Sequence, residues 1–126
     1  MATLSVSSLY LAGNQTYRGQ CVLIFDPRHA ARPDELSPAE WGGLCTDLYA
    51  AERAVIRVAQ PDHVTLASLG NEVPHLHWHI IPRYLQEPRW GMPIWTAVPA
   101  EMRHIALPAA ERAKLIDALR TALETT

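Results

Sequence analysis

Three histidines at alternate positions are the residues of this sequence whose type and spacing best suit chemistry. They lie in the run His75-Leu76-His77-Trp78-His79. Because successive side chains of a β-strand point to opposite faces, we expect the three imidazoles to share one face and the apolar residues between them to pack in the core. The run therefore predicts a strand that holds a polar row in fixed geometry, as a reactive site requires.

The residues alone leave two kinds of chemistry open for this row. Three imidazoles and a water molecule can hold a catalytic zinc ion, so His75, His77 and His79 are candidate ligands. A neutral imidazole is also a good nucleophile near pH 7, and neighbouring imidazoles can donate protons to phosphate oxygens or to a leaving group. A row of solvated histidines without a task is disfavoured, because one strand seldom needs three identical titratable groups.

Apolar patterning predicts the strands that surround this row. Residues 4–11, 20–26 and 63–69 are short apolar runs that stop near glycine, proline or asparagine, and the histidine run adds a strand at 75–81. The run at 20–26 is apolar almost throughout, which is typical of a strand buried on both faces. We therefore expect the histidines to lie in a sheet rather than on a helix.

Two helices are predicted beside these strands. Ser37 and Glu40 can form a capping box, with a proline in the first turn, and the helix that they start is expected to end before Pro61. An apolar stripe at helical spacing predicts a second helix over residues 109–123, whereas five prolines between 82 and 108 argue against regular structure there. Strands and helices together predict an α+β fold, with helices packed on an antiparallel sheet.

Composition narrows the class of protein. The chain has 126 residues, of which 48% are hydrophobic, so we expect a single domain over 1–126 with a packed core. A formal net charge of -2 and a pI near 6.3 argue against a protein that coats nucleic-acid polymers, but allow a small phosphorylated ligand. No secretory signal and no apolar run of about 20 residues is visible, so no membrane partner is expected. Cys21 and Cys45 lie in apolar sequence and are predicted to be buried free thiols, which favours a cytoplasmic protein.

The sequence around the histidines resembles the signature of the histidine triad (HIT) family. That signature is His-x-His-x-His followed by two apolar residues, often with Pro-Arg next, and here Ile80-Ile81-Pro82-Arg83 follows the run. Gly70-Asn71 precedes the run, and a buried strand, Pro27-Arg28-His29 and a helix come earlier in the chain, in agreement with the family. The resemblance covers about residues 5–84. The segment from Trp90 to Trp95 resembles one bacterial branch more weakly.

The resemblance implies an architecture and a domain organisation. A HIT-like fold is an antiparallel sheet with a long helix after the second strand, to which this chain adds a C-terminal helix. We expect one HIT-like domain with a motif-bearing core at about 5–84, a segment rich in proline and tryptophan at 85–108, and the C-terminal helix at 109–124. By resemblance alone, the protein is expected to be a homodimer.

The resemblance also implies an activity. The family contains nucleotide hydrolases and nucleotidyl transferases, which cleave at the α-phosphorus of nucleoside phosphoramidates or dinucleoside polyphosphates. By motif position, His77 is the expected catalytic nucleophile that forms a covalent nucleotidyl-histidine. His79 is expected to donate to the phosphate or the leaving group, and His75 to orient the others through hydrogen bonds. Such a covalent route replaces one hard step by two easier ones.

Four further residues match positions that bind substrate in the family: Gln20, Thr65, Gly70 and Asn71. Many relatives have histidine where Gln20 stands, and a glutamine can hydrogen-bond a phosphate but cannot carry a positive charge. This position is therefore not expected to protonate a leaving group. Thr65 stands where relatives often have asparagine, and its hydroxyl can still donate to a phosphate oxygen. Gly70 and Asn71 suit a loop that supplies donors to phosphate.

Four other residues near the motif are expected to have no direct part in the reaction. Glu72 is expected to face solvent, because a carboxylate beside a phosphate is repulsive. Arg83 is expected to make an exposed salt bridge, and His29 to lie at the surface. Trp78 is expected in the core, since it lies on the strand face opposite the histidines.

The expected partner is a small nucleotide substrate with a purine base, and no nucleic-acid polymer. The covalent route requires no cofactor, although a polyphosphate substrate can bring a divalent cation with it. Two alternatives remain beside this function. One is a zinc protein that uses the three histidines as ligands. The other is a nucleotide-binding module without catalysis, which Gln20 and Glu72 motivate.

Overall fold

A five-stranded antiparallel sheet and two helices build the fold of this chain, as a computed structural model that describes residues 1–126 shows. The strands follow the spatial order β1-β2-β3-β5-β4, and the predicted α+β class is confirmed. The elements are β1 (Ala2–Thr3), β2 (Ser7–Leu11), β3 (Cys21–Phe25), α1 (Pro38–Ala59), β4 (His63–Ala67), β5 (His77–Arg83) and α2 (Ala109–Glu124), with short 3-10 helices at Pro33–Glu35, Ile94–Thr96 and Pro99–Glu101.

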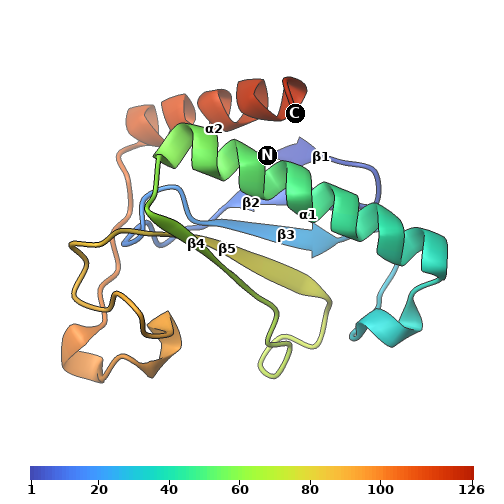
Figure 1. Cartoon of the computed structure of the whole chain (residues 1–126), viewed down its shortest axis with the longest axis horizontal. Helices are drawn as coiled ribbons and strands as arrows, with labels where there is room; N and C mark the ends of the chain where they lie inside the picture. The colour runs from blue at the N-terminus through green and yellow to red at the C-terminus, as the bar shows by residue number, and fades with distance from the viewer.

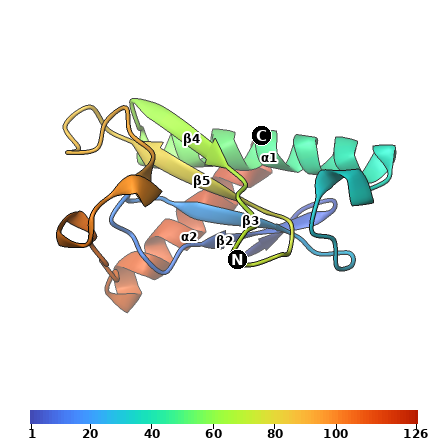
Figure 2. The ribbon, with the colours of Figure 1, turned by 90° about the horizontal axis from the view of Figure 1, so that it is seen from below.

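Both helices lie on one side of the sheet, with α1 across the strands and α2 beside α1 (Figure 1). The opposite face of the sheet carries neither α1 nor α2 and is turned toward the viewer in Figure 2. The segment between β5 and α2 lies at one end of the strands, beside this uncovered face. A site on the uncovered face can therefore be reached by a ligand without opening the core.

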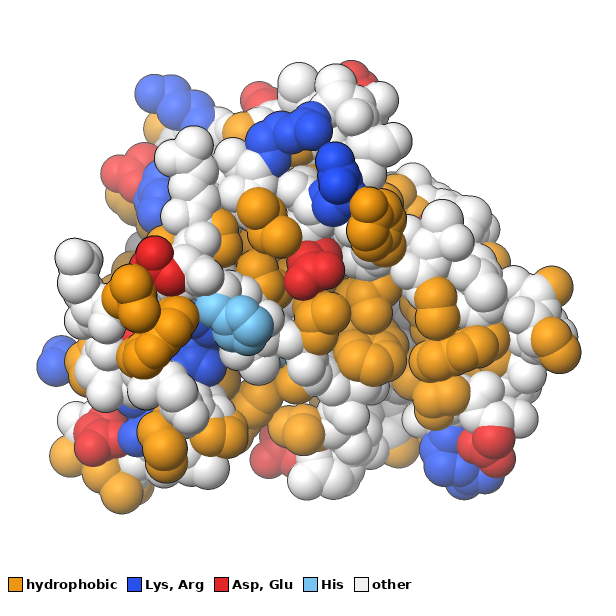
Figure 3. Space-filling view, in the orientation of Figure 1, with side chains coloured by type: hydrophobic (Ala, Val, Ile, Leu, Met, Phe, Trp, Pro, Cys, Tyr) orange, Lys and Arg blue, Asp and Glu red, His pale blue; other side chains and the backbone are white.

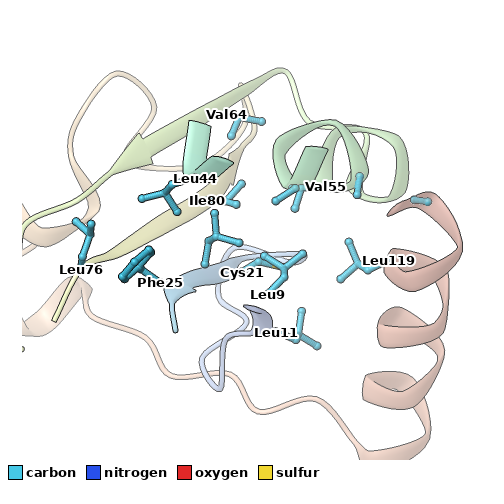
Figure 4. Packing of buried hydrophobic residues seen from close by; sticks show 14 of the residues in the cluster. Leu9, Leu11, Cys21, Phe25, Leu44, Val55, Val64, Leu76, Ile80 and Leu119 are labelled. Carbon is cyan, nitrogen blue, oxygen red and sulfur yellow. The ribbon is translucent and has the colours of Figure 1, made fainter. Parts of the chain in front are cut away.

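The core lies between the sheet and the helices, and the labelled side chains of Figure 4 point into it from both layers. Alternate residues of β3, namely Cys21, Leu23 and Phe25, are fully buried there. Leu44 of α1 and Leu119 of α2 meet them from the helix side. Because side chains alternate along a strand, this arrangement directs the intervening residues of β3 to the uncovered face.

The start of α1 matches the capping box predicted from sequence. The Ser37 hydroxyl oxygen accepts from the Glu40 backbone N–H at 3.1 Å, and the Glu40 carboxylate accepts from the Ser37 N–H at 2.8 Å. The helix ends at Ala59, where Gln60 adopts a left-handed conformation with φ of 48°. Both predicted limits are confirmed. Because the short strand β1 precedes β2, the long helix follows the third strand and not the second.

The two cysteines differ in burial, so the prediction that both are buried is wrong for Cys45. Cys21 is fully buried in β3, and burial raises the pKa of its thiol to about 12. Cys45 is exposed on α1. It follows Leu44, the buried residue, and one step along a helix turns the side chain by about 100° away from the core.

Hydrogen bonds hold segment 85–108 against the rest of the fold at both ends, although the segment lacks long regular structure. At its start, the Arg83 guanidinium donates to the backbone oxygens of Arg89 and Met92. At its end, the Gln15 N–H donates to the Ile105 oxygen at 2.7 Å. The segment therefore runs from the end of β5 to the loop between β2 and β3.

Neither α1 nor α2 has the length and apolar character that a membrane-spanning helix needs.

Arg83 is buried, so the prediction of an exposed salt bridge is wrong. The side chains of Arg83 and Glu87 are only 5% and 8% exposed, and the Arg83 Nε donates to a Glu87 carboxylate oxygen at 2.7 Å. The Thr65 hydroxyl accepts a further hydrogen bond from Arg83 at 3.2 Å. Arg83 lies on the same face of β5 as His77 and His79, where segment 85–108 covers it.

Candidate active site

His77 and His79 line a cavity of about 620 Å³ at the uncovered face of the sheet, which we call the histidine pocket. The β3–β5 register sets Ile24 opposite His77 and Val22 opposite His79, so rigid neighbouring strands fix both imidazoles. Three other parts of the chain complete the walls: the loop between β2 and β3, the turn before β5 and segment 85–108. They contribute, among others, Thr16, Tyr17, Gln20, Gly70, Asn71, Glu72, Arg89, Trp95, Glu101 and Arg103.

The hydrogen bond made by His77 determines which of its ring nitrogens faces a ligand. The His77 Nδ1 lies 2.6 Å from the backbone oxygen of His75. Since a carbonyl oxygen only accepts, Nδ1 must carry the proton and donate. A neutral His77 then has its lone pair on Nε2, which is the state that a nucleophile needs.

His75 does not share the face of His77 and His79, contrary to the alternation expected from sequence. Strand β5 begins at His77, and the chain before it turns so that the Leu76 N–H donates to the Ala30 oxygen at 2.7 Å. The His75 side chain is not part of the histidine pocket. Its contribution to that pocket is the backbone oxygen that accepts from His77.

His29 and His75 form a pair of stacked imidazoles outside the histidine pocket. Their ring centroids lie 5.1 Å apart, and the two Nδ1 atoms are 2.9 Å apart. The His75 Nε2 contacts the backbone oxygen of Phe25, so Nε2 carries the proton of a neutral His75. The His29 Nδ1 must then donate to the His75 Nδ1. His29 is exposed, as expected, but it also holds the residue whose backbone orients His77.

We expect His29→Phe to lower kcat by roughly threefold to tenfold, because it keeps a stacked ring but removes one orienting hydrogen bond of about 0.5–1.5 kcal/mol. KM for the nucleotide is expected to stay unchanged, because His29 does not line the histidine pocket. Steady-state kinetics check this split, with His104→Phe as the control at another exposed histidine. A His29→Phe protein with raised KM and unchanged kcat would contradict the positioning role.

His79 is the second imidazole of the pocket, and its surroundings favour the neutral form. Burial of the side chain lowers the pKa of His79, and the nearby His77 lowers it further. The Trp95 ring packs edge-on against it, with 5.0 Å between ring centroids. The His79 Nδ1 is buried without a hydrogen-bond partner, which leaves Nε2 as the polar atom that can serve a ligand.

The lowered pKa gives His79 a defined effect on the pH dependence of stability. Between the folded pKa and the unfolded value near 6.5, the unfolded chain binds more protons at this site. The free energy of unfolding is therefore expected to fall as pH drops from 6.5 toward the folded pKa, and to lose this slope in His79→Asn. An NMR titration of the His79 ring protons checks the direction, and a midpoint at or above 6.5 would contradict it.

The predicted substrate-binding residues divide between two places. Gln20, Gly70 and Asn71 line the histidine pocket together with His77 and His79, whereas Thr65 does not. Thr65 lies on the neighbouring part of the same sheet face, where its hydroxyl accepts from Arg83. Three of the four residues are thus brought together around the histidines.

Gln20 is held in place by a buried residue that the sequence did not point to. Gln15 is 2% exposed, and its amide donates to the backbone oxygens of Ala12 and Gln20 at 2.9 and 3.0 Å. Its own oxygen accepts from the Gly19 N–H at 2.9 Å. Gly19 has a φ of 96°, and a Cβ there would lie 2.9 Å from the Ala59 Cβ, so glycine is required. A short polar loop with two glutamines carries no motif that would have revealed this network.

The sequence also did not predict the charged side chains that segment 85–108 contributes to the histidine pocket. Arg89 pairs with Glu101 at 2.7 Å, and Arg103 lies nearby on the lining. Trp95 was the visible signal, since tryptophans in a proline-rich stretch indicate packing. Glu72 is exposed as expected, although it also contributes to the rim.

The three histidines of the motif are not arranged as a set of metal ligands. Both ring nitrogens of His75 are engaged, one with His29 and one with Phe25, and the His77 Nδ1 is engaged with the His75 oxygen. No group of three histidine, cysteine, aspartate or glutamate side chains is placed to hold a metal ion. The donor geometry therefore does not fit a zinc site of three histidines.

Comparisons with known proteins point to one family. A family model described as HIT domain matches residues 13–86. A histidine triad protein from Bradyrhizobium japonicum has a similar structure, with 28% identity, a TM-score of 0.86 and coverage of 96% of this chain and 87% of that chain. A histidine triad protein from Marinobacter aquaeolei VT8 is similar in fold, with 23% identity, a TM-score of 0.85 and coverage of 98% and 86%.

A hypothetical histidine triad nucleotide-binding protein from Sulfolobus tokodaii strain7 shares the fold at 16% identity, with a TM-score of 0.74 and coverage of 98% and 82%. No curated protein sequence matches the chain at a significant level. The family model spans more than half of the chain, including the β2–β3 loop, α1 and the complete histidine run. The chain therefore belongs to the HIT domain family, whose members are in general nucleotide-binding hydrolases and transferases.

Proposed function

We propose that the protein hydrolyses or transfers a nucleotidyl group at the α-phosphorus of a nucleoside phosphoramidate or dinucleoside polyphosphate, through a covalent intermediate on His77. The observation that carries this proposal is the short contact between the His77 Nδ1 and the His75 oxygen. It leaves a nucleophilic lone pair on Nε2 in a pocket large enough for a nucleotide.

In the first proposed step, the His77 Nε2 attacks the α-phosphorus. An N–P bond forms, and the bond from phosphorus to the leaving group breaks with its electron pair on the departing atom, which takes a proton from solvent. In the second step, water attacks the same phosphorus and loses a proton to solvent. The N–P bond breaks with its electron pair on the His77 Nε2, which releases the nucleoside monophosphate and restores His77. Neither step requires a cofactor.

Other residues of the histidine pocket can stabilise negative charge on the phosphoryl oxygens. A neutral His79 can donate a hydrogen bond from Nε2, and the Gln20 amide can donate another. Gly70 has a φ of 69°, so the turn before β5 presents backbone to the pocket with no side chain in the way. We propose that the substrate is a purine nucleotide. By the same family resemblance we propose that the protein is a homodimer, and sedimentation velocity of the protein tests this.

The test is to mix the protein with an adenosine 5′-phosphoramidate, quench in mild base and measure both AMP release and intact mass. Release of AMP together with a nucleotidyl adduct supports the proposal. The alternative of a binding module predicts that AMP binds while neither phosphoramidates nor diadenosine polyphosphates are turned over. That result would overturn the catalytic function.

A further inference from the structure

The histidine pocket carries balanced charges, which leaves few cations for the phosphate of a nucleotide. Its lining includes two arginines and two glutamates: Arg89, Arg103, Glu72 and Glu101. Arg89 is already paired with Glu101, and Figure 3 shows acidic and basic side chains close together among hydrophobic ones over segment 85–108, at the lower left. Arg103 is exposed, and no hydrogen bond within the chain holds its guanidinium in place. The pocket therefore depends on neutral donors to stabilise negative charge on the phosphoryl oxygens.

One neutral donor of the pocket is the hydroxyl of Tyr17, which the proposed chemistry does not use. Tyr17 lines the histidine pocket and is half-buried. Its hydroxyl makes no hydrogen bond within the chain and is not fully buried, so a ligand can reach it. The Tyr84 hydroxyl, in contrast, lies 3.0 and 3.3 Å from the backbone oxygens of Arg18 and Ala59. Tyrosine hydroxyls inside a fold usually have such a partner, so the Tyr17 hydroxyl still has a hydrogen bond to make.

A tight turn fixes Tyr17 beside Gln20. The Gln20 N–H donates to the Tyr17 backbone oxygen at 2.9 Å, which closes the turn. Gly19 is the third residue of this turn, and its φ of 96° is typical of a type II turn. Tyr17 and Gln20 are therefore the two ends of one tight turn, and both residues line the histidine pocket.

The register of the sheet places this turn next to His79. Gln20 comes one residue before β3 and shares the uncovered face with Val22, which is opposite His79. Gln20 is thus diagonal to His79 across the β3–β5 pair, at a separation that long side chains can bridge. The turn that carries Tyr17 therefore flanks the imidazoles between which a phosphoryl group would lie.

The Tyr17 ring is held by a contact that does not need the hydroxyl. The Arg83 guanidinium lies 5.4 Å from the ring centroid, within the range of a cation–π interaction. The buried pair with Glu87 holds Arg83 itself in place. Phenylalanine could make the same contact, so packing against Arg83 does not explain the hydroxyl. Its ring is fixed and its donor is free, which is the arrangement that a preorganised site requires.

The Tyr17 hydroxyl keeps its proton near neutral pH. Burial raises the pKa of Tyr17 above its ordinary value, and the negative charge of Glu87 raises it further. The positive charges of Arg83 and Arg89 oppose this rise without cancelling it. The hydroxyl is therefore available as a hydrogen-bond donor under the conditions in which His77 is a neutral nucleophile.

We propose that the Tyr17 hydroxyl is a catalytic hydrogen-bond donor to one nonbridging oxygen of the α-phosphate. This inference rests on the proposed function and assigns a further residue to the same reaction. The hydroxyl keeps its proton throughout, and its hydrogen bond stabilises the negative charge that the equatorial oxygens carry in the transition state. Tyr17 and Gln20 thus act as a pair of uncharged donors on one turn.

The first test is Tyr17→Phe, which keeps the ring against Arg83 and removes only the hydroxyl. We expect kcat/KM for an adenosine 5′-phosphoramidate to fall roughly tenfold to hundredfold, as loss of a hydrogen bond to a charged group predicts. Tyr49→Phe is the matched control, because Tyr49 is an exposed tyrosine on α1 that does not line the histidine pocket. An unchanged kcat/KM in Tyr17→Phe would overturn the proposal.

Sulfur in place of one nonbridging oxygen separates a contact with the phosphate from a structural role of Tyr17. The substitution gives two diastereomers of the phosphoramidate, and sulfur is a weak hydrogen-bond acceptor. The hydroxyl can therefore assist only the diastereomer whose oxygen faces Tyr17. We expect Tyr17→Phe to slow that diastereomer at least about threefold more than the other. Equal slowing of both would show that Tyr17 acts only on the shape of the pocket, and it would overturn the contact.

Binding of AMP and adenosine, which differ only by the phosphate, separates this inference from the covalent function. Calorimetry compares His77→Ala with the double variant that also carries Tyr17→Phe. We expect the second change to weaken AMP binding at least about threefold and to leave adenosine binding unchanged. That result, if no substrate is turned over, would support the Tyr17 contact and sink only the covalent function. Equal AMP binding, with unchanged turnover in Tyr17→Phe, would overturn the contact and leave the covalent function standing.

Discussion

Replacement of His77 by alanine is expected to lower kcat/KM for an adenosine 5′-phosphoramidate by about 10⁴-fold or more, as loss of a covalent nucleophile does in other enzymes. His77 supplies the only lone pair in the pocket that a hydrogen bond orients toward a ligand, through its contact with the His75 oxygen. Gln20 cannot take over, because its amide is not nucleophilic, and His79 has no hydrogen bond at Nδ1 that would fix a lone pair on its accessible Nε2. Initial rates of AMP release measure the effect.

The control for this prediction is His104→Ala, an exposed histidine that does not line the histidine pocket. A second variant, His77→Gly, creates space at the nucleophile, and added imidazole is expected to restore part of its activity. Binding of AMP to His77→Ala checks that the pocket is still formed. Turnover of His77→Ala at the wild-type rate would show that another group attacks the phosphorus.

Replacement of Arg83 by methionine is expected to lower the free energy of unfolding by roughly 3–5 kcal/mol, because it leaves Glu87 buried without its partner. The same change removes the hydrogen bonds to Arg89 and Met92 that hold the start of segment 85–108 against the sheet. Urea unfolding measures the loss. Activity is expected to fall as well, since this segment forms a wall of the histidine pocket.

Two comparisons isolate the buried pair. Arg83→Met combined with Glu87→Leu is expected to recover part of the stability, because no uncompensated charge remains. Arg32→Met breaks a solvent-exposed pair with Asp34, whose side chains are 69% exposed, and is expected to leave unfolding unchanged. Equal losses of unfolding free energy in Arg83→Met and Arg32→Met would show that burial does not increase the contribution of the Arg83–Glu87 pair to stability.

Local signals in the sequence predicted the elements well. The capping box of Ser37 and Glu40 and the stop before Pro61 predicted α1, because helix ends depend on nearby backbone groups. The apolar run before Pro27 predicted β3 in the same way. Alternation along β5 likewise placed His77 and His79 together on the uncovered face, and the motif around them indicated the family.

Contacts between distant parts of the chain escaped prediction. His75 was expected beside His77, but its ring pairs with His29, 46 residues away, and the strand starts only after it. The side chains of Gln15 and Arg83 bond backbone groups of nearby irregular loops, and no spacing rule encodes such partners. Thr65 was expected to bind substrate, yet it lines a neighbouring cavity and not the histidine pocket.

The stereochemical course at phosphorus tests the covalent role of His77 most directly, whatever the lifetime of the intermediate. An adenosine 5′-phosphoramidate made chiral at the α-phosphorus with sulfur can be hydrolysed in ¹⁸O-labelled water and the product configuration determined. Two successive in-line displacements, first by His77 and then by water, each invert the centre, so net retention is the predicted result. Net inversion would mean that water attacks the substrate directly, and it would contradict the nucleotidyl-His77 intermediate.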